Sequence, residues 1–82
     1  MRYTVLILPR AEKELRRLPS SVEKRIIERL GALENDLQGD VKRLTNHEPA
    51  WRLRVGDYRV LFDVAGDRVL VQTIRHRREA YD

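Results

Sequence analysis

Trp51-Arg-Leu-Arg-Val-Gly-Asp-Tyr-Arg-Val-Leu-Phe62 is the stretch that decides the fold, because it is typical of two strands joined by a tight turn at Gly56-Asp57. Arg52 and Arg54 alternate with aliphatic residues, so both arginines are expected on one face of the first strand. Arg59 follows the turn and folds back beside them. Planar guanidinium groups match phosphate oxygens well. A sheet surface with several of them predicts a nucleic-acid partner.

Further strands are expected on both sides of this hairpin, wherever β-branched and apolar runs are bounded by turn residues. With the two strands of the hairpin, the expected strands are residues 2–8, 51–55, 58–64 and 69–74. The last two are joined by a turn at Ala65-Gly66-Asp67. The polar segment 40–49 contains Asn46, His47 and Pro49 and is expected to be a loop.

Two helices are expected between the first strand and the polar segment. In residues 9–18, Ala11, Leu15 and Leu18 recur at helical spacing, and Pro19 closes the segment. The second helix is expected to begin at Ser20, which forms a capping-box pattern with Glu23. Its apolar stripe is expected to continue to a stop at Gly39. The stripe comprises Val22, Ile26, Leu30, Leu33 and Leu37.

The predicted fold class is α+β, in the order β-α-α-β-β-β, with residues 1–82 as a small single domain. A helical hairpin would pack on one face of a twisted, mainly antiparallel sheet. That arrangement leaves the other sheet face, or its rim, for function.

Composition narrows the chemistry. The chain has no cysteine and two histidines, so we expect no disulfide, no metal site and no cofactor. No apolar run reaches the length of a membrane span, and we expect a soluble, cytoplasmic protein. The net charge of +4 decides little by itself. All seven basic residues from 52 onward are arginine, with three at 52–59 and three at 75–78, and this clustering is the informative signal.

The chain resembles the RelE/ParE superfamily of toxins from type II toxin-antitoxin systems, and it is most similar to the RelE branch. The motifs that carry the resemblance follow the family's order over nearly the whole chain. They are Leu8-Pro-Arg-Ala11, Leu15-Arg-Arg-Leu-Pro19, Lys42-Arg-Leu44, Trp51-Arg-Leu-Arg54, Gly56-Asp-Tyr-Arg-Val-Leu-Phe62 and His76-Arg-Arg-Glu-Ala-Tyr81. The resemblance implies an architecture similar to microbial ribonucleases.

The resemblance also implies an activity, which is cleavage of messenger RNA in the A site of the 30S ribosomal subunit, held in check by a cognate, RelB-like antitoxin. The metal-free cleavage that the resemblance implies uses the 2′-hydroxyl of the RNA as the nucleophile. By position in the motifs, the implied catalytic residues are Arg52, Arg54, Arg59, Arg77 and Tyr81. The arginines suit stabilisation of the charge that grows on phosphate.

The general base is left open by the sequence. Well-known members of the family have lysines where this chain has Arg52 and Arg54, and arginine does not lose its proton in proteins. His76, Glu79 and Tyr81 are the remaining titratable candidates, and histidine matches neutral pH best. His76 is therefore the candidate for proton transfer.

Other basic residues are candidates for contact with RNA or the ribosome, through the outer faces of the helices and the C-terminal cluster. They are Lys13, Arg16, Arg17, Lys24, Arg25, Arg75 and Arg78. The simpler interpretation of each is a solvated surface charge.

Two other functions are compatible with the same fold. One is a ParE-like inhibitor of DNA gyrase without nuclease activity. The other is a catalytically degenerate toxin retained for antitoxin binding, an alternative kept open by the missing lysines. The arginine set together with Tyr81 favours the nuclease.

Overall fold

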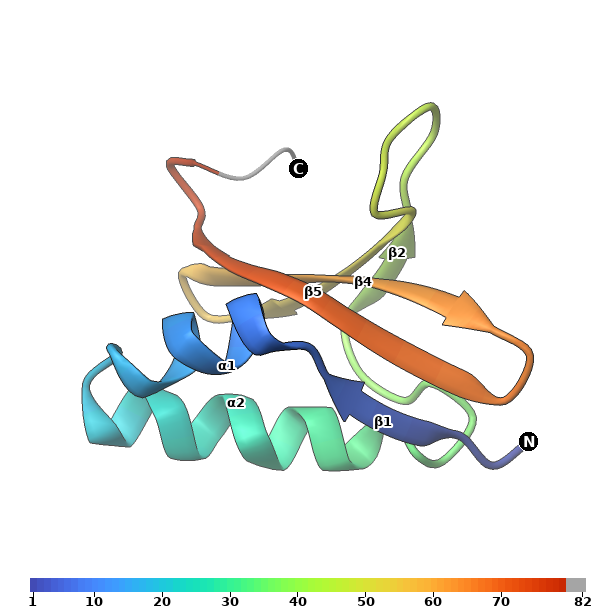
Figure 1. Ribbon diagram of the computed structural model, residues 1–82, viewed down its shortest axis with the longest axis horizontal. Helices are drawn as coiled ribbons and strands as arrows, with labels where there is room; N and C mark the ends of the chain where they lie inside the picture. Colours follow the sequence, from blue (N-terminus) through green and yellow to red (C-terminus); the bar gives the residue numbers. More distant parts are fainter. Residues whose placement is uncertain (80–82) are drawn as a thin grey trace.

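A five-stranded sheet, covered on one face by two helices, forms the part of the chain that the computed structural model describes, residues 1–79 (Figure 1). The elements are β1 (Thr4–Ile7), α1 (Pro9–Arg16), α2 (Ser20–Ala32), β2 (Val41–Arg43), β3 (Trp51–Val55), β4 (Tyr58–Ala65) and β5 (Arg68–His76). Neither helix is long and apolar enough to cross a membrane within this described range.

The strands lie in the order β1-β5-β4-β3-β2. β1 pairs parallel with β5, and every other neighbouring pair is antiparallel. The prediction of a mainly antiparallel sheet beneath a helical hairpin is therefore confirmed. The hairpin of β3 and β4 turns at Gly56-Asp57, as its sequence predicts, with Val55 opposite Tyr58.

The strand β2 was not predicted and corrects the expected order to β-α-α-β-β-β-β. It has only three residues, lies at the sheet edge against β3, and two of its residues are the exposed Lys42 and Arg43. Short, charged edge strands are common in natural sheets, because they discourage pairing with other chains. In sequence, such a strand looks like a polar loop.

Two details of the second helix also differ from prediction. Its N-cap is Pro19, with no side-chain hydrogen bond, so the predicted capping box of Ser20 and Glu23 does not form. The helix ends at Ala32 rather than near Gly39, and the backbone then turns through Asp36 and Leu37, which have positive φ angles of 57° and 56°. Gly39 therefore has a role other than stopping the helix.

The hydrophobic core lies between the sheet and the helices, and it uses the predicted helical stripe. Ile26, Leu30 and Leu33 are buried against aliphatic residues that alternate along the strands. Phe62 is fully buried, and the ring of Trp51 stacks on it at a centroid distance of 6.1 Å. Both aromatic residues are thus used in packing.

α1 covers the edge of β5 where β1 ends. β1 pairs with Arg68–Val71, and the amide of Leu8 donates to the carbonyl of Val71 at 3.0 Å. Beyond that point, Glu14 Oε1 accepts a hydrogen bond from Thr73 Oγ1 at 2.7 Å and one from the Ile74 amide at 3.0 Å. A helix carboxylate thus replaces the missing strand partner, since a buried amide needs an acceptor.

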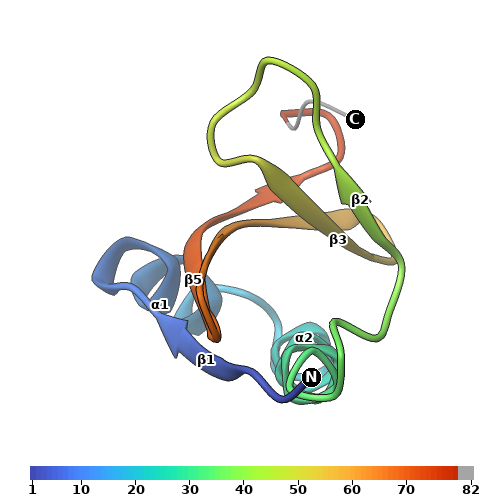
Figure 2. The same cartoon turned by 90° about the vertical axis from the view of Figure 1, so that its right-hand side faces the viewer.

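The opposite face of the sheet is walled by two segments far apart in the sequence. The loop between β2 and β3 and the turn after β5 both stand over this face, away from the helices (Figures 1 and 2). We call it the outer face.

Candidate nucleic-acid interface and catalytic site

One row of arginines crosses the outer face on three neighbouring strands. Arg54 on β3 lies opposite Arg59 on β4, and Arg59 lies opposite Arg75 on β5. Residues that are paired across a sheet point to the same face, so the three side chains project together. Arg52 belongs to the next row, opposite Leu61. The prediction that Arg52, Arg54 and Arg59 share a face is confirmed, and Arg75 joins them.

Directly opposed like charges destabilise a sheet. A cross-strand row of three arginines therefore costs folding free energy unless anions compensate it. Such a row is suited to bind phosphate groups, because guanidinium forks bind phosphate oxygens through charge-assisted hydrogen bonds.

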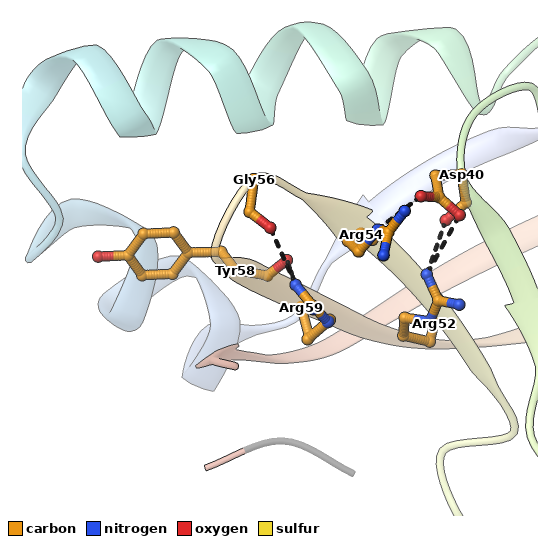
Figure 3. A network of polar contacts seen from close by, with 6 residues as sticks. All are labelled: Asp40, Arg52, Arg54, Gly56, Tyr58 and Arg59. Carbon is orange, nitrogen blue, oxygen red and sulfur yellow. Dashed lines mark hydrogen bonds and ion pairs between the residues drawn. The ribbon is translucent and has the colours of Figure 1, made fainter. Parts of the chain in front are cut away.

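The arginines differ sharply in exposure, which the sequence does not predict. The side chain of Arg54 is 53% exposed, whereas that of Arg52 is 8% exposed. Arg59 is also buried, and its Nη1 donates to the carbonyls of Gly56 and Tyr58 at 3.0 and 3.1 Å (Figure 3). Arg52 and Arg59 are thus held firmly in the sheet surface rather than extended into solvent.

Asp40 is the carboxylate between Arg52 and Arg54 (Figure 3). Its Oδ2 accepts from Arg54 Nε at 2.7 Å, and its Oδ1 lies 3.3 Å from Arg52 Nη1. The hydrogen bond from Arg54 is the largest cause that lowers the pKa of Asp40 below its ordinary value of 3.8. Partial burial is the next largest effect and opposes it, while the charge of Arg54 and the contact with Arg52 lower the pKa further. Sequence reasoning missed Asp40, because nothing in a polar segment marks which strand it will contact.

An open hollow of about 390 Å³ lies on the outer face beside the arginine row. Leu61, Thr73 and Arg75 contribute from the strands, Arg10 from α1, and Glu79 from the C-terminal turn. The β2–β3 loop adds His47, Glu48 and Pro49. The sequence did not single out Arg10 or this loop as functional.

The β2–β3 loop is held over the sheet by its own hydrogen bonds. The Leu44 amide donates to the Ala50 carbonyl at 2.7 Å, and the Ala50 amide donates to Asp63 Oδ1 at 3.0 Å. His47 Nδ1 lies 2.8 Å from the Pro49 carbonyl. The loop is therefore a preformed wall of the hollow.

The C-terminal arginines are tied to the turn between β3 and β4. The Arg77 amide donates to the Asp57 carbonyl at 2.7 Å, and Arg77 Nε lies 3.8 Å from Asp57 Oδ1. Arg77, Arg78 and His76 line a second open hollow, of about 480 Å³. Tyr81, the fifth predicted catalytic residue, lies outside the described residues.

His76 is not on the same face as the arginine row. It lies opposite Tyr58, one residue out of phase with Arg75, and its ring meets the Tyr58 ring edge to face at 5.4 Å. The Arg78 amide donates to His76 Nδ1 at 3.3 Å, so the proton of a neutral imidazole is on Nε2. In this arrangement Nε2 is the ring nitrogen that does not accept this hydrogen bond, and the role of His76 in proton transfer stays a prediction.

The basic residues of the helices fall into two groups. Lys13 and Arg17 line a hollow of about 410 Å³ along α1 together with Arg10, so they continue the basic surface beyond the sheet edge. Arg16, by contrast, forms an ion pair with Glu12 on the same helix.

Lys24 and Arg25 are exposed on α2, which covers the other face of the sheet (Figure 2). A Cβ atom added to Gly56 would lie 3.4 Å from Arg25 Nη1, so this arginine lies against the β3–β4 turn. The structure does not bring these two residues to the arginine row. Within residues 1–79, no group of three or more acidic, histidine or cysteine side chains is arranged to hold a metal ion.

Comparison with known proteins shows the family to which the chain belongs. Residues 5–81 match the model of a family described as the ParE toxin of type II toxin-antitoxin systems. The toxin RelE3 of Methanocaldococcus jannaschii is 32% identical over 75 residues, which cover 85% of each chain.

Two solved structures are similar over nearly the whole chain. One is the RelBE2 toxin-antitoxin complex of Mycobacterium tuberculosis, with a TM-score of 0.80, 27% identity, and coverage of 94% of this chain and 100% of that one. The other is the RelE-RelB complex of Pyrococcus horikoshii, with a TM-score of 0.79, 28% identity, and coverage of 98% and 100%. The chain therefore belongs to the ParE toxin family of type II toxin-antitoxin systems and is homologous to RelE toxins.

Proposed function

We propose that this protein is an endoribonuclease toxin that cuts messenger RNA in the A site of the 30S ribosomal subunit and acts in the cytoplasm. The observation that carries the proposal is the row of Arg54, Arg59 and Arg75 across three strands of the outer face. Three guanidinium groups side by side on one face of a sheet form a surface suited to an RNA backbone, whose phosphates bind them through charge-assisted hydrogen bonds.

The reaction consistent with this site is an in-line attack within the RNA. The 2′-oxygen forms a bond to phosphorus while the bond from phosphorus to the 5′-oxygen breaks, which leaves a 2′,3′-cyclic phosphate and a 5′-hydroxyl. One proton leaves the 2′-hydroxyl and one is delivered to the 5′-oxygen. Negative charge grows on the nonbridging oxygens, where preorganised guanidinium groups stabilise it most.

The residues take different parts in this proposal. Arg54 is exposed and would contact the phosphate directly, with Arg75 at the other end of the row, beyond Arg59. Arg59 is held by the Gly56 and Tyr58 carbonyls, and this rigidity is what electrostatic stabilisation requires. Arg77 would approach from the C-terminal turn, and Tyr81 would orient a base or assist proton transfer.

Arg52 is anchored to Asp40, and its contribution would be mainly to the shape and charge of the surface. The general base stays unassigned, because arginine does not lose its proton. His76 is the proposed residue for proton transfer, through the Nε2 that its hydrogen bond with the Arg78 amide leaves available.

A RelB-like antitoxin is the proposed protein partner, since the similar structures are complexes of RelE with RelB. An antitoxin segment that folds on binding can cover much of a small domain. The outer face, with its exposed cations, is suited to an acidic segment of such a partner.

The experiment is induced expression of the wild-type chain with Arg59→Ala and Arg77→Ala variants, while translation and the 5′ ends of messenger RNA are followed in the same cells. Arg68→Ala is the matched control, because Arg68 is exposed at the start of β5, away from the row. We expect growth arrest with new cuts inside translated messages for the wild type and the control, and no cuts for the other two.

The second candidate function is inhibition of DNA gyrase, which the ParE description of the matching family favours. Arrest with blocked replication or DNA damage, and without new messenger-RNA ends, would establish it in place of the nuclease. Antitoxin binding without any arrest would instead indicate a degenerate toxin.

A further inference from the structure

Asp40 is the acidic residue that contacts Arg52 and Arg54 on the outer face, and it lies in a turn outside the helices and strands. It precedes β2 by one residue, yet it contacts Arg52 and Arg54, 12 and 14 positions away in the sequence. An acid beside a site for a polyanion lowers affinity by charge repulsion. An acidic residue at this place therefore needs a role that offsets this loss of affinity.

The backbone fixes where Asp40 lies. The Arg54 amide donates to the Asp40 carbonyl at 2.9 Å, and Arg52 Nη1 donates to the same carbonyl at 3.2 Å. The preceding Gly39 has a φ angle of +136°, and a Cβ atom there would lie 3.0 Å from Leu53 Cδ1, within the fully buried core. Only glycine allows the chain to come this close to β3. The carboxylate is thus delivered to the arginines by a constrained turn.

The carboxylate of Asp40 binds the two arginines through different oxygen atoms. Oδ1 and the carbonyl face the buried Arg52, while Oδ2 holds the exposed Arg54 through Nε alone. Bonding through Nε leaves the two terminal amino groups of Arg54 without another partner among residues 1–79. Those two groups are the ones that can form a fork with phosphate oxygens.

We propose that Asp40 is a positioning residue that fixes the guanidinium of Arg54 for phosphate binding; this inference rests on the proposed nuclease function. An exposed arginine on a strand has many rotamers, and ordering it at the moment of binding costs free energy. The bond to Asp40 orders the side chain beforehand, and the geometry of the transition state is sensitive to such placement. Asp40 acts through Arg54 and does not itself contact the RNA.

The test is a double-mutant cycle in a purified system of ribosomes programmed with messenger RNA. Cleavage rates are measured under single-turnover conditions for the wild type, Asp40→Asn, Arg54→Ala and the double variant. We expect Asp40→Asn to slow cleavage by about tenfold to a hundredfold. In the Arg54→Ala background, the same change should have no further effect, because the group it positions is gone.

Asp36→Asn is the matched control, since Asp36 is an exposed aspartate that pairs with the chain's amino terminus at 3.4 Å. It should leave the rate unchanged. Asp40→Glu, which keeps the carboxylate, should restore part of the rate lost in Asp40→Asn. Urea denaturation of every variant separates a slower rate from a smaller folded fraction. If Asp40→Asn does not fold, the cycle is run with Asp40→Glu.

A structural readout is independent of activity. In an NMR spectrum of the arginine side chains, the Nε proton of Arg54 should exchange with water more slowly in the wild type than in Asp40→Asn. Equal exchange would overturn the proposal.

The outcomes also separate this inference from the proposed function. Equal losses from Asp40→Asn in both backgrounds, an unchanged rate, or a faster rate would overturn the role of Asp40. A faster rate would identify Asp40 as an anion that competes with RNA. If Arg59→Ala abolishes cleavage but Arg54→Ala does not, the nuclease stands and this inference falls. If neither variant slows cleavage, both fall.

Discussion

At the scale of a single residue, the ion pair of Asp40 should make the free energy of unfolding depend on pH. Arg54 lowers the pKa of the folded carboxyl below 3.8, so the folded state favours the ionised form more than the unfolded state does. The stabilisation is therefore complete above the unfolded pKa, near 4, and is lost as pH falls through the lower folded pKa.

The prediction compares the free energy of unfolding of the wild type and Asp40→Asn across the acid range by urea denaturation. The wild type should be the more stable protein near neutral pH, and the difference should shrink below a pH of about 4. Added salt should narrow the difference at neutral pH, because the pair is open to solvent. A difference that is constant with pH would show that the ion pair does not form in solution.

At the residue scale, the sequence predicts which arginines share a face, because strand alternation depends only on neighbouring residues. Burial is not predictable in this way. Arg52 is held by a contact with Asp40, and Arg59 by the turn carbonyls that it binds, so the placement of each depends on the folded chain. The face on which His76 lies depends in the same way on the folded chain, since it is set by the register of His76 against Tyr58.

At the scale of elements, α1 is joined to the sheet by Glu14 as well as by apolar packing. One carboxylate oxygen of Glu14 accepts hydrogen bonds from Thr73 Oγ1 and from the Ile74 amide. Both residues lie beyond the part of β5 that pairs with β1. Glu14 therefore completes the edge of β5.

Glu14→Ala should lower the free energy of unfolding by about 1–3 kcal/mol, because a buried amide and a buried hydroxyl lose their acceptor. Glu12→Ala on the same helix is the control. Glu12 forms a surface ion pair with Arg16, and its loss should change stability by less than about 1 kcal/mol. Urea denaturation of both variants tests the difference, and equal effects would exclude the proposed edge role.

Gly39 and Gly66 are two glycines whose substitution by alanine can be compared at this scale. Both have positive φ angles, +136° and +61°, but only an added Cβ at Gly39 would meet the core, at Leu53. Gly39→Ala should therefore destabilise the protein more than Gly66→Ala, which costs about 1 kcal/mol from backbone strain. Thermal unfolding of the two variants measures this order, and the reverse order would contradict the close approach of this turn to β3.

Element types were largely predictable, because both helices and the other four strands have clear apolar periodicity. The strand β2 was missed, since three residues at an edge carry no usable period. Gly39 was expected at a helix end, yet it allows a turn to approach β3. Its actual role depends on a neighbour 14 positions away, which local pattern does not reveal.

At the scale of the whole molecule, the helices bury one face of the sheet and leave the arginine row on the other. The loop 44–50 and the C-terminal turn then enclose that face from two sides (Figure 1). The sequence predicts the helix layer and the sheet layer but not the two segments that border the outer face. Each of these segments is placed by contacts with distant residues such as Asp63 and Asp57. Together they border the charged surface and form the hollow.

The most direct measurement of the central claim is cleavage of messenger RNA by the purified protein on programmed ribosomes, with the 5′ ends mapped. The account predicts cuts within the A-site codon for the wild type and for Arg68→Ala, and loss of those cuts with Arg59→Ala while the variant stays folded. Intact messenger RNA with the folded wild-type protein, or cutting that persists in Arg59→Ala, would contradict it.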